Sequence, residues 1–198
     1  MSLGKNMPDQ TLLKLLEDIR ACKSCDLPHG PRPVVQADEG ARILIVGQAP
    51  GRRVHETGIP FNDPSGDRLR DWMGIDRDTF YDARKIAIAP MGFCYPGTGK
   101  SGDLAPRPEC AKQWRAPLMA QLPNIKLTVI IGQYAIDWHL GAEKRKTLAE
   151  NVRAGQELGP DRIVLPHPSP RNNIWIKKNP WFLDDILPTL KSRVQELL

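Results

Sequence analysis

Four cysteines are the residues of this chain with the clearest chemical use: Cys22, Cys25, Cys94 and Cys110. The first two form a Cys-x-x-Cys pair, which presents two sulfurs on one side of a turn. The second two are separated by fifteen residues rich in glycine and proline, which can fold back on themselves. A reducing cytoplasm disfavours disulfides. The spacing therefore predicts a metal centre, with zinc, ordinary buried thiols and a thioredoxin-like redox pair as alternatives.

His167 is the second candidate for chemistry, because it stands between Pro166 and Pro168 directly after a short apolar run. A single histidine is more often structural than catalytic. An imidazole held between two prolines at the end of a strand is nevertheless an unusual setting, and it marks His167 as a candidate functional side chain.

The elements that position these residues alternate along the chain. Apolar runs at residues 42–46, 85–89, 127–131 and 163–165 predict strands buried on both faces. Helical patterns occupy residues 10–21 with Asp9 as N-cap, a segment capped by Ser65, residues 109–122 with a bend at Pro117, and residues 134–140. A closing helix follows residue 179 and should kink at Pro188.

This alternation predicts a single-domain, three-layer α/β/α fold with a central, mostly parallel four-stranded sheet. One domain spans residues 1–198, and we expect residues 1–9 to be flexible. Ligands of open parallel sheets bind beyond the carboxyl ends of the strands. Residues 47–51 and 167–172 each begin where a predicted strand ends, so both loops should meet at that edge.

Composition narrows the function classes. The chain has 198 residues, a size that suits one domain, and its 28 Lys and Arg against 23 Asp and Glu give a net charge of +5. This excess of basic residues favours a polyanionic partner over a membrane. No run is long enough to span a bilayer, and residues 1–9 lack the apolar core of a signal peptide. We therefore expect a cytoplasmic protein, and we take it to be a monomer.

Three groups of residues together resemble a known family. The sequence IVGQAPG at residues 45–51, followed by ETGIPF at 56–61 and Ser65-Gly66, resembles the first motif of uracil-DNA glycosylases. His167-Pro168-Ser169-Pro170 resembles the second motif of that superfamily. The four cysteines resemble the cluster ligands of its iron–sulfur branch, called family 4. The resemblance extends from about residue 12 to residue 190.

The resemblance implies a DNA base-excision repair glycosylase that hydrolyses the N-glycosidic bond of uracil, or of a related damaged base, in DNA. It implies a [4Fe-4S] cluster at the four cysteines, with zinc at the same positions as the alternative. The enzyme would be monofunctional, since no lysine is placed as a Schiff-base nucleophile. The cluster would be structural, because hydrolysis of this bond requires no electron transfer.

The same resemblance assigns roles to individual residues. Phe61 takes the position on which the extruded base stacks, and a core aromatic is the alternative. His167 would donate a hydrogen bond to the departing base as it becomes negative. The residues expected to bind the base are Gly47, Gln48, Ala49, Phe61 and Asn62.

Two positions depart from the family pattern. Gln48 stands where the iron–sulfur branch has glutamate, and a glutamine can orient water but cannot act as a general base. Glu56, Asp63 and His55 are near enough in sequence to replace that carboxylate. Pro90 stands where the branch has the asparagine that recognises uracil. Base discrimination would then depend on Gln48, Asn62 or backbone groups.

Basic and polar residues beside both motifs are the expected DNA contacts, since charge and exposed amides hold phosphates. The loop through residues 171–174 is the segment expected to enter the duplex where the base leaves. Two other functions remain open: a catalytically weak protein that binds damaged bases or single-stranded DNA, and a hydrolase of free nucleosides or nucleotides. The DNA-contact residues are Arg52, Arg53, Ser169, Arg171, Asn172 and Lys177.

Overall fold

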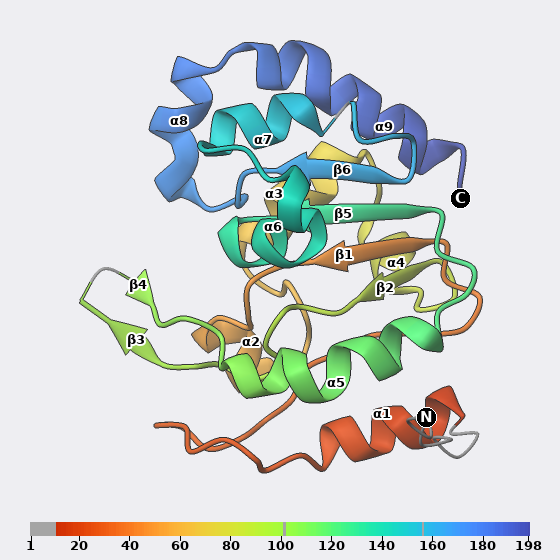
Figure 1. The fold of residues 1–198 in the computed structure, drawn as a ribbon, viewed down its shortest axis with the longest axis vertical. Coiled ribbons are helices and arrows are strands. Elements are labelled where there is room, and N and C mark those ends of the chain that lie inside the picture. The colour runs from red at the N-terminus through yellow and green to blue at the C-terminus, as the bar shows by residue number, and fades with distance from the viewer. Residues whose placement is uncertain (1–10, 101, 156) are drawn as a thin grey trace, which may run out of the picture.

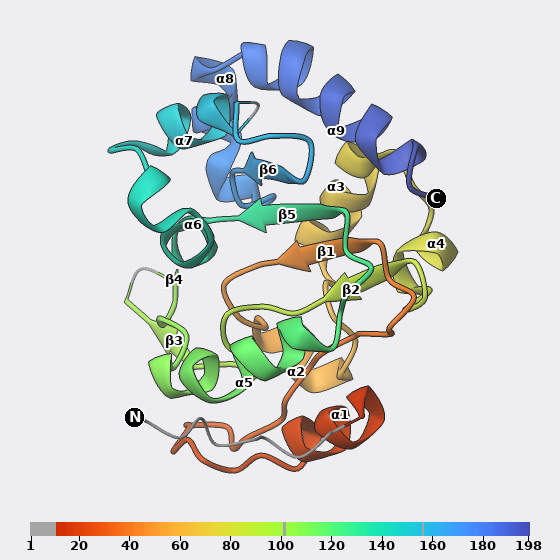
Figure 2. The same cartoon turned by 45° about the vertical axis from the view of Figure 1, so that its right-hand side comes forward.

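The computed structural model describes residues 11–100, 102–155 and 157–198, and a four-stranded parallel sheet lies at its centre (Figures 1 and 2). The strand order is β2-β1-β5-β6. This confirms the predicted fold class. The expected flexibility of residues 1–9, and Asp9 as a helix cap, lie outside the described residues. The strands are β1 (Ile43–Val46), β2 (Ile86–Ile88), β5 (Leu127–Ile131) and β6 (Arg162–Leu165).

Continuous apolar runs form this sheet because both of its faces are covered. All four residues of β1 are buried, and Ile43 pairs with Ile86 on one side and Leu127 on the other. Strand β5 continues the ladder to β6, where Ile131 pairs with Leu165. The sheet therefore forms the core that fixes the loops at its carboxyl edge.

Helices cover the two faces of the sheet (Figures 1 and 2). The connection from β1 to β2 includes α3 (Pro64–Met73), which packs against the C-terminal helix α9 (Leu187–Gln195). The connection from β2 to β5 runs through α5 (Pro108–Ala120), which packs against α1 (Leu12–Arg20). Helices α6 (Gln133–Leu140) and α7 (Leu148–Ala154) connect β5 to β6 and contact these two strands.

Several helix boundaries differ from those predicted. Asp63, not Ser65, is the N-cap of α3: its Oδ1 accepts the Gly66 N–H at 2.8 Å, and Pro64 takes the first helical turn. Thr11 caps α1. Helix α5 continues through Pro117 to Ala120. The closing segment contains a π-helical stretch at Phe182–Ile186, immediately before α9.

Short elements were missed by the sequence patterns. They carry too few apolar positions for a clear period, and the hairpin is rich in glycine. The hairpin lies between Cys94 and Cys110, where only a structured loop was predicted. The missed elements are α2 (Arg52–Thr57), α4 (Arg77–Tyr81), α8 (Asn173–Lys178), the helix α7, and the hairpin of β3 (Thr98–Gly99) and β4 (Gly102–Asp103).

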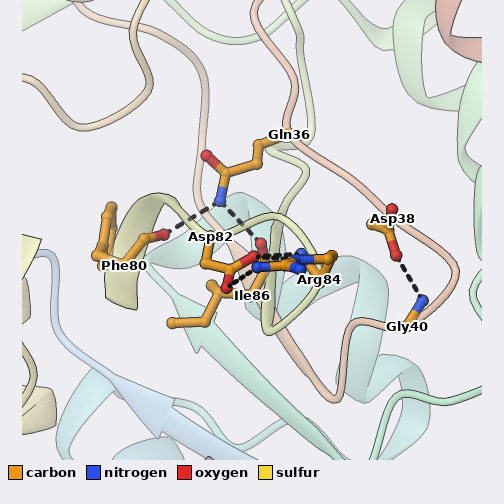
Figure 3. Close-up of polar contacts among 7 residues, drawn as sticks. All are labelled: Gln36, Asp38, Gly40, Phe80, Asp82, Arg84 and Ile86. Atoms are coloured by element: carbon orange, nitrogen blue, oxygen red, sulfur yellow. Dashed lines mark hydrogen bonds and ion pairs between the residues drawn. The ribbon is translucent and has the colours of Figure 1, made fainter. Parts of the chain in front are cut away.

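The edge strand β2 is held by the segment that precedes β1. Figure 3 shows the Gln36 side-chain amide donating to the backbone oxygens of Phe80, at 3.1 Å, and Ile86, at 2.8 Å. Gln36 also forms an antiparallel backbone bridge with Ile88. These bonds protect the sheet edge and fix the exit of β2 toward Pro90.

Within the described part of the chain, no helix is both long and apolar enough to cross a lipid bilayer.

Candidate active site

A cavity of about 460 Å³ opens at the carboxyl ends of β1, β2 and β6. The two loops predicted to meet, 47–51 and 167–172, both contribute to its walls. The segment around Phe61 and the β3–β4 hairpin complete it. Sequence-predicted residues that line it are Gly47, Gln48, Ala49, Phe61, Ser169, Arg171, Asn172 and His167; the other polar side chains are Asp63, Ser65 and Asp103.

Phe61 forms one wall of the cavity in an unusual backbone conformation. Its φ is +52°, the only positive value at a non-glycine among the described residues. The turn depends on Gly66, because a Cβ there would lie 1.7 Å from the Phe61 carbonyl oxygen. Gly47 lies next to the ring, whose Cζ is 3.5 Å from where a Gly47 side chain would begin. Strain of this kind is typical of functional positions.

His167 lies in the other loop that lines the cavity, residues 167–172, and its ring has a defined tautomer. Its Nδ1 accepts the backbone N–H of Ser169 at 3.2 Å, so the proton of the neutral ring is assigned to Nε2. Burial lowers the pKa of His167, Arg171 lowers it further, and the negative charges of Asp63 and Asp103 oppose this shift. At neutral pH the side chain is therefore an uncharged donor facing the cavity.

The loop after His167 is fixed by side chains on both sides. Asn172 Nδ2 donates to the His167 carbonyl oxygen at 2.7 Å. Arg68 of α3 donates to the Ser169 carbonyl oxygen at 3.3 Å and to Asn173 Oδ1 at 2.8 Å. Arg68 was missed by sequence reasoning, because its partners are more than a hundred residues away along the chain.

Gln48, the glutamine of the first motif, forms a hydrogen bond within the fold. Gln48 Nε2 donates to the Leu104 carbonyl oxygen at 3.1 Å, which ties the first motif to the residue that follows the β3–β4 hairpin. Its side-chain oxygen remains an acceptor. The Gln48 side chain thus has a structural role, because its amide joins two walls of the cavity.

The backbone beside Pro90, which lines the cavity, is held by the buried side chain of Arg115. Arg115 of α5 donates to the carbonyl oxygen of Ala89 at 2.6 Å, and its Nη2 lies 2.8 Å from His139 Nε2. Burial lowers the pKa of Arg115 to about 10, while Cys110 raises it. Burial, together with the charge of Arg115, lowers the pKa of His139 to about 3. His139 therefore accepts a hydrogen bond as a neutral ring.

Other predicted residues do not line the cavity. The side chain of Asn62 is turned toward α4, where its Oδ1 accepts a hydrogen bond from Arg77 at 3.0 Å, which is a correction to its expected place at the base. Glu56 is exposed and pairs with Arg52 at 3.2 Å. His55 packs against Tyr95, with ring centroids 5.9 Å apart. Of the three proposed substitutes for the missing carboxylate, the cavity contains Asp63.

The remaining expected DNA contacts are exposed on neighbouring helices. Arg52 and Arg53 lie on α2, which begins directly after Gly51 of the cavity wall. Lys177 lies on α8, which follows the His167 loop. The side chain of Ile174, at the start of α8, is 69% exposed.

Comparison with known proteins agrees with this site. The model of the uracil DNA glycosylase superfamily matches residues 34–191. The chain belongs to the uracil-DNA glycosylase superfamily. It is similar to the type-4 uracil-DNA glycosylase of Archaeoglobus fulgidus, with 29% identity over 133 residues, which is 64% of this chain and 62% of the relative. The match thus spans less than two thirds of that relative. Residues 34–191, which match the superfamily model, include both loops of the cavity.

The four cysteines of this superfamily member lie around a second, smaller pocket. It is enclosed by the loop after α1, the segment 92–94 and the first turns of α5, and Ile19 and Trp114 contribute apolar walls. Each cysteine is half-buried and unpaired with another in a disulfide. The two cysteine pairs, far apart in sequence, are therefore brought to one place.

The surroundings of the sulfurs suit thiolates bound to a metal group. The Phe93 N–H donates to Cys110 Sγ at 3.3 Å, and the Arg32 N–H donates to Cys94. Burial raises the pKa of Cys94 to about 11 and that of Cys110 to about 12, so both are neutral thiols at neutral pH unless a bound metal stabilises their ionised form.

Across residues 11–100, 102–155 and 157–198, no group of three or more His, Cys, Asp or Glu side chains is placed to hold a metal ion.

Proposed function

We propose that this protein is a DNA base-excision glycosylase that hydrolyses the N-glycosidic bond of uracil, or of a related damaged base, in DNA. The observation that carries the proposal is one cavity that is lined by both Phe61 and a neutral His167. An aromatic wall and a hydrogen-bond donor are what an extruded base requires. The alignment with a type-4 uracil-DNA glycosylase supports the same activity.

Phe61 and His167 would act on the two ends of the base. The ring of Phe61 stacks on the base, and the glycines around it let the backbone approach closely. As the bond to deoxyribose breaks, the base takes up negative charge on its carbonyl oxygen. His167 donates to that oxygen from Nε2 without first having to lose a proton, and this lowers the barrier.

DNA would approach across the mouth of the cavity. Arg171 at the rim and the exposed Arg52 and Lys177 on the flanking helices would hold phosphates through charge. Ile174 is the apolar side chain best placed to fill the gap that the departing base leaves in the duplex.

The cysteines Cys22, Cys25, Cys94 and Cys110 would hold a [4Fe-4S] cluster. When bound, that cluster joins the loop after α1 to the start of α5 and supplies no electron to the hydrolysis. The protein purified without oxygen should be brown and contain about four irons per chain. Stoichiometric zinc without iron, in protein made with adequate iron, would contradict this assignment.

Recognition of the base would depend on residues other than Pro90 and Asn62. Pro90 offers no amide to the cavity, and Asn62 is turned toward Arg77. Among the described residues, the side-chain oxygen of Gln48 and the backbone of residues 47–51 are polar groups available on that side of the cavity. A panel of strands containing uracil, hypoxanthine or xanthine would identify the preferred base.

The test of the proposal is base release. Single- and double-stranded oligonucleotides carrying one uracil are incubated with the protein, and abasic sites are detected by cleavage in alkali. A monofunctional glycosylase yields free base and a strand that breaks only after alkali. Breakage without alkali would contradict the monofunctional assignment.

Two other functions predict different results. A damaged-base or single-strand binding protein, favoured by Gln48 and Pro90 in place of the family's residues, would bind these strands without releasing base. A hydrolase of free nucleosides would act on deoxyuridine and show no salt-sensitive affinity for DNA. Binding measured by fluorescence anisotropy across salt concentrations, beside the release assay, separates all three.

A further inference from the structure

The cavity contains a carboxylate that the sequence motifs do not indicate. Asp103, at the end of the β3–β4 hairpin, lines the same cavity as His167. Its Oδ2 lies 3.5 Å from where a side chain at Gly51 would begin, so the carboxylate stands over the first motif loop. Asp103 comes from the cysteine loop, more than fifty residues after that motif.

Both motif loops hold the hairpin in this position. Asp103 pairs with Thr98 across the hairpin, and Gln48 binds the carbonyl oxygen of the next residue, Leu104. On the other side, the Arg171 guanidinium covers Gly102, where a Cβ would come within 2.2 Å of its Nη1. A larger residue than glycine at position 102 would displace this arginine.

The other candidates for the general base are engaged in other contacts or lie outside the cavity. Asp63, the second carboxylate of the cavity, uses Oδ1 to cap α3. Glu56 is paired on the surface with Arg52, and His55 packs against Tyr95 outside the cavity. Gln48 cannot accept a proton at neutral pH. Among the described residues that line the cavity, Asp103 is therefore the carboxylate that caps no helix.

The charges around Asp103 are mixed. Asp103 is an exposed residue that is partly desolvated where it lines the cavity. This partial desolvation raises the pKa of its carboxyl, Arg171 and His167 lower it, and the negative charge of Asp63 raises it. The net direction is upward, and a carboxylate with a raised pKa is a better proton acceptor.

We propose that Asp103 is the general base of the glycosylase, replacing the carboxylate that Gln48 does not provide. The water oxygen forms a bond to C1′ of deoxyribose and its proton passes to Asp103. The bond from C1′ to the base nitrogen breaks, its electron pair leaves with the base, and His167 donates a hydrogen bond to the base oxygen. The inference rests on the proposed function.

The test measures single-turnover release of base across pH for four variants and the parent. Asp103→Asn keeps the shape and removes the basic group, and should lower the rate at neutral pH by about a hundredfold or more. In the parent, the rate should fall at low pH as Asp103 takes up a proton. This acidic limb of the pH profile should be absent from Asp103→Asn, while affinity for DNA changes little. Asp103→Glu should restore part of the rate and the limb.

Two controls make the same chemical change elsewhere. Asp71→Asn, on the exposed face of α3, should match the parent. Asp63→Asn retains a cap for α3 and should keep the acidic limb. Thermal unfolding and iron content verify that each variant is folded and carries the same metal as the parent.

The outcomes are distinguishable. If the parent releases no base from any strand of the panel, the proposed function fails and this inference fails with it. If the parent is active and Asp103→Asn retains its rate within about threefold with the acidic limb intact, the assignment to Asp103 alone is wrong. Loss of the limb in Asp63→Asn in place of Asp103→Asn would move the role to Asp63.

Discussion

The buried pair of Arg115 and His139 makes the stability of this protein dependent on pH in a calculable way. His139 accepts from Arg115 at 2.8 Å, and burial together with that cation lowers its pKa from 6.5 to about 3. In the unfolded chain the same imidazole titrates near 6.5. Below that pH the unfolded state gains a proton that the folded state does not bind.

The magnitude follows from the two pKa values. The contribution of His139 to stability is complete above pH 6.5 and is lost as the pH falls toward 3, with a slope of about 1.4 kcal/mol per pH unit. Between pH 7.5 and 5.0 the loss is about 2 kcal/mol, and over the whole interval it approaches about 5 kcal/mol. For a chain of this size, about 2 kcal/mol lowers the unfolding temperature by about 4–8 °C.

His139→Gln is the informative change, because the amide oxygen still accepts from Arg115 and does not titrate in this range. Thermal unfolding is recorded at pH 7.5 and 5.0 for the parent, this variant and His29→Gln, which removes an exposed histidine instead. We expect the midpoint of the parent and of the His29 variant to fall by about 4–8 °C more than that of His139→Gln. Equal pH dependence in all three would refute a neutral, buried His139.

Four further changes test the site. His167→Ala should lower the single-turnover rate by about 10- to 1,000-fold with DNA affinity nearly unchanged, and full activity would remove it from the chemistry. Cys110→Ser should lose the iron and the brown colour and unfold at a lower temperature; unchanged iron content would argue against its role as a ligand. Gly66→Ala should destabilise the fold by about 1–3 kcal/mol and slow base release, because Phe61 must move; a parental unfolding midpoint and rate would contradict that tight packing. Ile174→Ala should slow release from double-stranded DNA more than from single-stranded DNA, and equal effects on both would exclude it as the wedge.

The sequence predicted the sheet well because its strands are continuous β-branched and aliphatic runs. Strand β5 has the predicted bounds, and β1, β2 and β6 differ from theirs by a residue at one or both ends. The loops at the carboxyl edge follow from that topology, so the meeting of residues 47–51 with 167–172 was predictable from strand order and direction alone. Helix caps were less predictable: Asp63 and Ser65 both cap well, and the Pro64 between them selects Asp63.

Long-range side-chain contacts left no comparable signal. The Arg68 bonds to Ser169 and Asn173, and the Arg115 bond to His139, join segments whose proximity depends on the packing of whole helices. The β3–β4 hairpin has two residues in each strand, so it shows no alternation of apolar and polar side chains. Asp103 was therefore indistinguishable from a solvated loop residue.

The glutamine of the first motif illustrates why a site cannot be judged one position at a time. In the sequence, Gln48 in place of glutamate indicates that the motif has lost its general base. In the structure its amide nitrogen donates to the Leu104 carbonyl oxygen, which a carboxylate at this position would repel. The Gln48 amide, which cannot act as a base, thus also holds the hairpin that brings Asp103 over Gly51. One hydrogen bond thus joins Gln48 of the first motif to the residue that follows Asp103, so substitutions at Gln48 should be read together with the position of the hairpin.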